Sequence, residues 1–440
     1  MLQVRKQSAM GEDVWTFPFG GLIAFLSLYY LSPEDFIPFL ANLPTGKIIA
    51  ALTLGTVIYR NLLMKQSWLV FPIEAKRFFV FVGIIVIGIP FSIWSGGSVE
   101  VFMQRVIPIT MFFVIIGNTV ETPKQVHILA SLMVACGVLI SLVACYHYAI
   151  GEVDQFGRLI GYGSKEYENP NDLAMGLLTL IPISAALFSG EHRAARRWVF
   201  ALAIGVMCAA ILASLSRTGM VGLAFLGSLM LVNLARKNLL KTVLAAILLS
   251  ALGLAVLAAS PTVADRFESI FSDDKDDAGS KAERLAHMSD ALTVLSEHPL
   301  MGVGIGQSMV AIVAMHNNAA DQWVKVHNVY LLIGAELGVP GLCVYVWMII
   351  AVFRALKRAK GAKGHSHMAE NGIANHLGIG LRHAILVFAI TAAFSPVAYN
   401  WFLYILIGLA SVHMSTSAQP VSSSSPSRNV LRHSLRPVRA

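Results

Sequence analysis

The chain has 440 residues, of which 56% are hydrophobic and only 13% are charged, and its mean hydropathy is +0.67. Soluble proteins carry about 25% charged residues, so this composition excludes an ordinary soluble domain and predicts a protein with many membrane spans. The formal net charge is +8, but Lys and Arg fall in short clusters between apolar runs. Such clusters are typical of membrane topology. We therefore expect no nucleic-acid partner.

The four cysteines lie inside apolar runs, without paired spacing and without nearby histidine clusters. This pattern indicates neither a disulfide framework nor a zinc site. We expect packing roles for the cysteines, no metal and no cofactor.

Runs of about 20 apolar residues indicate twelve transmembrane helices. The first run, Val14 to Leu31, follows a basic N-terminus and lacks a small-residue cleavage site, so we expect a retained helix rather than a removed signal. The other runs lie near residues 46–63, 78–95, 101–120, 126–150, 171–188, 197–214, 218–235, 241–260, 328–356, 382–397 and 399–414. The predicted fold class is an all-α integral membrane protein.

Basic residues concentrate in alternate connections between these runs, and such connections stay in the cytoplasm. They are Arg5 and Lys6; Arg60, Lys65, Lys76 and Arg77; Lys124; Arg193, Arg196 and Arg197; Arg236, Lys237 and Lys241; and 354–363. The intervening connections are short, mixed or acidic. Both termini are predicted to be cytoplasmic, and the longest connection is predicted to face outward.

This long polar connection divides the chain. We expect nine transmembrane helices in residues 1–260, an outward loop over a membrane active site in 261–327, and three more helices in 328–415. Residues 416–440, with four consecutive serines, read as a disordered cytoplasmic tail. The acidic run at 273–277 is interpreted as a solvated part of the loop rather than a metal site.

A polar break, SLSRTG at 214–219, separates two apolar runs and carries Arg217. An arginine near hydrocarbon costs roughly 2.5 to 3.5 kcal/mol even on the most lenient scale, so it needs compensation. Arg217 either snorkels to lipid headgroups or binds an anion such as phosphate at the start of the next helix. In a second polar turn, ENPNDLA at 168–174, Asn171 or Asp172 either caps a helix or positions a substrate.

Within the loop, residues 281–296 predict an amphipathic helix with Leu285, Met288, Leu292 and Leu295 on its packing face. Arg284 falls within that face, so we expect it to point inward. It is a second candidate for holding an anion, against pairing with a local carboxylate. The following HPLMGVGIG, 298–306, is not a dinucleotide fingerprint because no strand precedes it. Its glycines are expected to form tight turns.

The loop ends at His327, at the outer mouth of the next helix. Histidine exchanges protons near neutral pH, so His327 is either a general base or a hydrogen-bonded structural residue. Glu336, about two and a half turns deeper, is either its interior partner or part of a polar packing contact. Two cations and one base on the same side of the membrane suit transfer from a phosphate leaving group.

Together these stretches resemble the O-antigen ligase and O-antigen polymerase superfamily. The resemblance spans roughly residues 168–341 and rests on NPND, SLSRTG, the helix of Arg284, HP-x-x-G-x-G and HN-x-x-L-x-x-x-x-E-x-G-x-x-G. It implies a metal-independent glycosyltransferase of the bacterial inner membrane that takes a glycan from undecaprenyl diphosphate at the periplasmic face. Arg217 and Arg284 would then bind the diphosphate and His327 would activate the acceptor hydroxyl. Supporting roles would fall to residues of the same motifs: Asn171, Ser216, Asn328 and Glu336.

The sequence does not identify the acceptor of the glycan. The acceptor is lipid A-core in ligases of this resemblance, another carrier-linked repeat unit in polymerases, and a Ser or Thr in protein-glycosylating relatives. The compact single loop favours a ligase. A transporter or flippase is the alternative of another class, although we find no internal repeat of the kind that transporter halves show.

Overall fold

The computed structural model describes residues 15–35, 37–41, 43–63, 71–154, 158–161, 169–236, 238–244, 280–316, 325–361 and 368–417, with isolated positions at 69, 167, 246–247, 263–264 and 268. Within these residues the fold is helical, and the one β feature is a single antiparallel bridge between Val153 and Leu159. The acidic run at 273–277, most of the loop before Ser280 and the tail after Ser417 lie outside the described residues.

Eleven of the twelve predicted spans overlap helices, while most of the run at 241–260 lies outside the described residues. The helices are α1 Phe17–Leu31, α2 Pro38–Ala41, α3 Thr45–Leu63, α4 Ile73–Gly88, α5 Ser95–Val101, a π-helical segment Phe102–Val106, α6 Ile107–Thr119, α7 Pro123–Ala149, α8 Pro170–Gly190, α9 Ala194–Ala213, α10 Arg217–Ala235, α13 Ser280–Glu297, α14 Ser308–Met315, α15 Val329–Gly361, α16 Met368–Thr391 and α17 Trp401–Ser417.

Seven described helices are long and apolar enough to cross a membrane. They are the continuous helix 95–119, α7, α8, α9, α10, α15 and α16. The helices α1 and α17 are apolar but shorter. The chain is therefore a helical membrane protein, and the full set of twelve spans stays a prediction.

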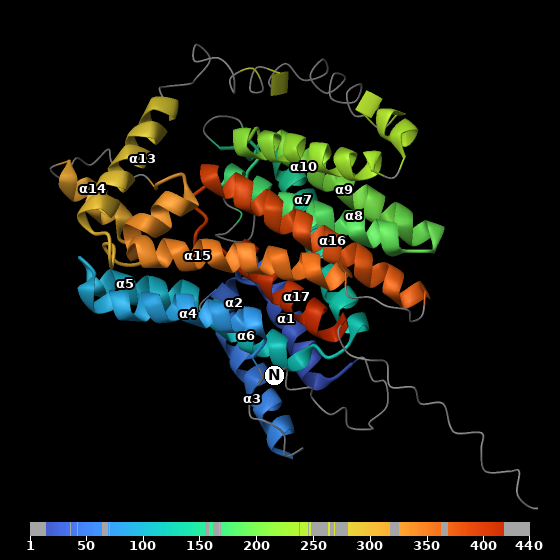
Figure 1. Ribbon diagram of the computed structural model, residues 1–440, viewed down its shortest axis with the longest axis horizontal. Coiled ribbons are helices and arrows are strands. Elements are labelled where there is room, and N and C mark those ends of the chain that lie inside the picture. Colours follow the sequence, from blue (N-terminus) through green and yellow to red (C-terminus); the bar gives the residue numbers. More distant parts are fainter. Residues whose placement is uncertain are drawn as a thin grey trace, which may run out of the picture.

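The centre of the bundle is formed by α8 and α17, which are buried on nearly all sides. A helix that is apolar all round has no polar face to turn outward, so it is most stable when neighbours surround it. The outer helices instead expose large apolar side chains, such as Trp198 and Leu202 on α9. Figure 1 shows α10 and α13 on one side of α15 and α17, and α1, α3 and α6 on the other.

The helices α8, α10 and α15 all begin at one end of the bundle, here named the α13 end because α13 and α14 lie there (Figure 1). The Thr218 hydroxyl donates to the Phe394 carbonyl at 3.5 Å, which joins the start of α10 to the segment after α16. At the other end, Arg60 of α3 binds the Asn118 carbonyl and the Glu121 carboxylate, each at 2.9 Å. Consecutive long helices therefore run in opposite directions.

The predicted packing face of α13 is partly wrong. Leu285 and Leu292 are 60% and 52% exposed, whereas His287, Ala291 and Val294 are buried. Apolar side chains cover more than one face of this helix, so periodicity alone could not select the face that packs against α15. Arg284 precedes His287 by three residues and therefore lies on the packed side, half-buried, as expected.

Candidate active site

Side-chain hydrogen bonds join the starts of α8 and α10. The Ser216 hydroxyl accepts from the Gly219 N–H at 3.1 Å and donates to Asn171 Oδ1 at 2.7 Å. Ser216 thus caps α10 and ties it to α8. The cap of α8 is Asn169, which accepts from the Asn171 N–H at 2.8 Å. The expectation that Asn171 or Asp172 caps this helix is therefore wrong, because the cap lies one residue before Pro170.

The turn that presents Arg217 is strained. Leu215 has a φ of +50°, a left-handed conformation that costs a residue with a Cβ about 1 to 3 kcal/mol and is held only by its surroundings. Here the neighbours Ser214 and Ser216 are fully buried. Arg217 is the first residue of α10 and is half-buried. The turn therefore holds a guanidinium beside the N-terminus of α10, where backbone N–H groups and the helix dipole favour an anion.

His327 stands directly before α15, whose cap is Asn328. The Asn328 side chain accepts from the backbone N–H of Tyr330 at 2.9 Å and of Leu331 at 3.1 Å. This explains Asn328 as a capping residue. His327 is half-buried, and its Nδ1 is buried with no hydrogen-bond partner among the described residues.

The pKa of His327 is lowered to about 4, chiefly because burial deprives the charged imidazolium of hydration. The positive charge of Arg284 acts in the same direction, whereas the backbone carbonyl of Lys325 favours the protonated ring. The imidazole is consequently neutral at pH 7 and able to accept a proton. The charge interaction with Arg284 also places that residue of α13 near His327, so two of the predicted site residues come together, one from α13 and one from the segment before α15.

Two charged residues of this region, Lys325 and Arg105, were not singled out from the sequence. Asp172 of α8 interacts electrostatically with Lys325, which precedes His327, and with Arg105 of the π-helical segment. Its Oδ1 is buried with no hydrogen-bond partner in the described part of the chain. The sequence did contain one sign of this region: Arg105 lies inside a long apolar run, where a charge is costly and therefore marks a candidate functional residue. The π-helical geometry that orients it has no recognisable sequence pattern.

Glu336 of α15 contacts a different segment, residues 302–307, which we name the glycine turn. Gly302, Gly304 and Gly306 have φ values of +65°, +99° and +75°, which confirms the predicted tight turns. A Cβ on Gly302 would lie 2.3 Å from the Glu336 carbonyl carbon, so the turn lies directly against α15. Glu336 Oε2 accepts from the Gly306 N–H and from the Tyr399 hydroxyl, each at 2.8 Å.

The other Glu336 oxygen, Oε1, accepts from the Ser308 hydroxyl at 2.7 Å. Glu336 is thus a packing residue that holds the glycine turn on α15, and not the interior partner of His327. No three His, Cys, Asp or Glu side chains in the described ranges come together as a metal site requires.

Residues 202–346 match the family model described as O-antigen ligase (Wzy_C). This segment belongs to the O-antigen ligase superfamily. It contains Arg217, Arg284, His327 and Glu336, whereas Asn171 precedes it. A comparison with curated proteins found no match. The O-antigen ligase match and the seven apolar helices support a membrane protein of the glycosyltransferase type, with a glycan-transfer function in O-antigen or lipopolysaccharide biosynthesis.

Proposed function

We propose that this protein transfers a glycan from undecaprenyl diphosphate to an acceptor hydroxyl at the periplasmic face of the bacterial inner membrane. The observation that carries the proposal is a neutral, half-buried histidine with an arginine beside it, at the end of the bundle where a second arginine begins α10. All three residues lie in the O-antigen ligase segment.

Arg217 and Arg284 are proposed to hold the diphosphate. Their guanidinium groups come from α10 and α13, and a guanidinium forms two parallel hydrogen bonds to phosphate oxygens. The N-terminus of α10 adds N–H groups directed at the same anion. Fixed positive charges are most effective where negative charge develops, which here is on the departing diphosphate.

His327 is proposed to be the general base. The acceptor oxygen attacks the anomeric carbon of the donor glycan, the bond from that carbon to the diphosphate oxygen breaks, and the hydroxyl proton passes to the imidazole. The low pKa keeps His327 unprotonated before the reaction. A bound diphosphate offsets the charge of Arg284, so the imidazole becomes more basic once the donor is in place.

The acceptor is proposed to be lipid A-core, which makes the protein an O-antigen ligase. A polymerase that extends carrier-linked repeat units shares the same donor chemistry and is the second candidate. The alternation of basic connections supports cytoplasmic termini and an outward α13 end. A transporter is less well supported, because the matched segment is described as a ligase.

The decisive experiment is transfer by the purified protein in detergent, with an undecaprenyl-diphosphate-linked glycan and EDTA present. Product on lipid A-core identifies a ligase, whereas a ladder on the carrier identifies a polymerase. Product that forms only when EDTA is omitted would contradict metal independence. If the donor binds and neither acceptor reacts, both proposed acceptors are wrong, and if the donor does not bind, the transporter becomes the better account.

Arg217→Lys tests the diphosphate role in the same assay. Lysine keeps the charge and loses the two-pronged geometry, so we expect kcat/KM for the donor to fall about tenfold or more. Arg193→Lys, at the opposite end of the bundle before α9, is the matched control and should leave transfer unchanged. Full activity of Arg217→Lys would mean that a point charge near lipid headgroups is enough.

A further inference from the structure

A cavity of about 340 Å³ is lined mainly by residues of α1, α3 and α6. These helices lie on the side of α17 away from α10 and α13 (Figure 1). The lining of the cavity includes both apolar and charged residues. Phe25, Leu28 and Met111 supply an apolar side, and Lys47, Arg105 and Glu34 supply charges. None of these residues belongs to the diphosphate site proposed above.

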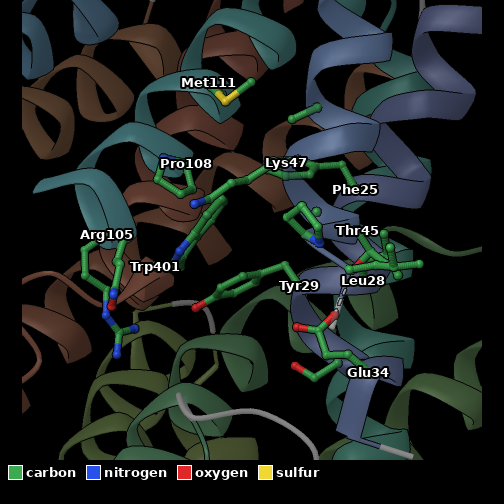
Figure 2. Close-up of a pocket in the computed structure, with 16 residues that line it drawn as sticks. Phe25, Leu28, Tyr29, Glu34, Thr45, Lys47, Arg105, Pro108, Met111 and Trp401 are labelled. Atoms are coloured by element: carbon green, nitrogen blue, oxygen red, sulfur yellow. Dashed lines mark hydrogen bonds between the residues drawn. The ribbon is translucent and has the colours of Figure 1, made fainter. Parts of the chain in front are cut away.

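The two cations reach the cavity from different helices. Figure 2 shows Lys47 extending from α3 across the cavity toward Pro108 of α6, while Arg105 lies on the far side from Glu34. Glu34 accepts a hydrogen bond from the Thr45 hydroxyl at 3.0 Å. The structure gives Lys47 no ion-pair partner among the residues it describes. The cavity therefore carries a net positive charge, with one ammonium available to a ligand.

A second observation points to a polar ligand at the same place. Tyr29 lines the cavity, and its hydroxyl is buried beside the Trp401 backbone N–H, without a partner in good hydrogen-bond geometry among the described residues. Buried hydroxyl groups are normally hydrogen-bonded, so an unsatisfied hydroxyl on a cavity-lining residue calls for an explanation such as a ligand. The Tyr29 ring stacks on Trp401 with centroids 4.1 Å apart, which holds the hydroxyl in position.

The cavity adjoins the catalytic region through Arg105. This residue interacts electrostatically with Asp172, which lies beside Asn171 and also interacts with Lys325. Arg105 stands in the π-helical segment, a rare geometry that often occurs at functional sites. A phosphate held between Lys47 and Arg105 would leave the rest of a headgroup near the start of α8, on the approach to His327.

We propose that this cavity binds a phosphate of the membrane-embedded acceptor lipid, between Lys47, Arg105 and the Tyr29 hydroxyl, with hydrocarbon against Phe25, Leu28 and Met111. This inference rests on the proposed function, because it assigns the acceptor of that reaction. The donor diphosphate and the acceptor lipid then enter from opposite sides of α15 and α17. Two lipids have the required chemistry, a phosphorylated lipid A-core and a second polyprenyl diphosphate glycan.

Lipid binding tests this site without requiring turnover. The full chain in neutral phosphatidylcholine nanodiscs is titrated with bis-phosphorylated lipid A-core, with the same lipid after phosphatase treatment, and with polyprenyl diphosphate glycan. We expect Lys47→Gln to weaken binding of a phosphorylated lipid about tenfold. Lys47→Arg should restore binding, and the dephosphorylated lipid should not respond to either change. Lys124→Gln, an exposed lysine at the opposite end, is the matched control.

The outcomes separate the two lipids and the two proposals. An effect limited to lipid A-core identifies the ligase acceptor, and an effect limited to polyprenyl diphosphate identifies the polymerase acceptor. If Lys47→Gln changes binding of neither lipid, or changes the dephosphorylated lipid equally, the cavity does not bind an acceptor phosphate. Failure of transfer in the wild type, with the binding differences intact, would instead overturn the proposed reaction.

Discussion

Two buried polar regions lie at the α13 end, and they differ in how their polar groups are satisfied. Around the glycine turn, both oxygens of Glu336 accept hydrogen bonds from backbone or hydroxyl donors. Around His327, the imidazole Nδ1 and the Asp172 Oδ1 are buried without a hydrogen-bond partner among the described residues. A network in which every polar group is hydrogen-bonded rigidifies a fold. Buried polar groups without a hydrogen-bond partner call for an explanation, such as a ligand.

The comparison assigns the two regions different roles, although both carry ionisable residues of the matched ligase segment. We expect changes around Glu336 to act on stability and changes around His327 to act on transfer. This separation can be measured, because the folded fraction and the activity per folded molecule are independent quantities.

The largest expected effect is that of His327→Ala on transfer. Loss of a general base should lower kcat by about 10² to 10⁴-fold while donor binding and thermal stability stay near the wild-type values. His316→Ala is the control, since His316 is exposed and pairs only with Asp290, at 3.1 Å, among the contacts of the described residues. Equal losses in the two variants, or full activity of His327→Ala, would remove His327 from the base role.

A smaller effect is expected for Glu336→Gln, which preserves size. In either orientation the new amide NH2 faces a backbone N–H, of Gly306 or of Ser308, and one donor is left unsatisfied. The cost should be about 1 to 3 kcal/mol of unfolding free energy, seen as a lower thermal midpoint in detergent. Activity per folded molecule should change little. An unchanged midpoint together with lost transfer would move Glu336 into the reaction.

The smallest effect is expected for pH, on which the rate of transfer should depend only weakly. Because the pKa of His327 is lowered to about 4, its neutral form persists well below pH 6.5. We therefore expect kcat/KM, which reports the free enzyme, to vary only about twofold between pH 5.5 and 8. A fall centred near pH 6.5 would show that His327 is exposed to water in the working enzyme.

Hydropathy was sufficient to locate eleven helices, because a long apolar run in a membrane has few alternatives to a helix. Motif reading selected Arg217, because an arginine near hydrocarbon is costly, and Arg284, because it falls on the packing face of an amphipathic helix. It selected His327 as a group able to exchange protons at the mouth of a helix. It also indicated tight glycine turns at 302–306, which the positive φ values confirm.

Packing decided the rest. The face of α13 depended on its contact with α15, since apolar residues such as Leu285 and Ala291 point in several directions. The helix cap at Asn169, the bond from Ser216 to Asn171 and the four donors around Glu336 depend on residues that only folding brings together. The cavity of Lys47 and Arg105 joins residues 58 positions apart, on helices whose proximity no local pattern records. Local hydrophobicity therefore determines where this chain crosses the membrane, whereas long-range contacts determine which of its polar groups meet.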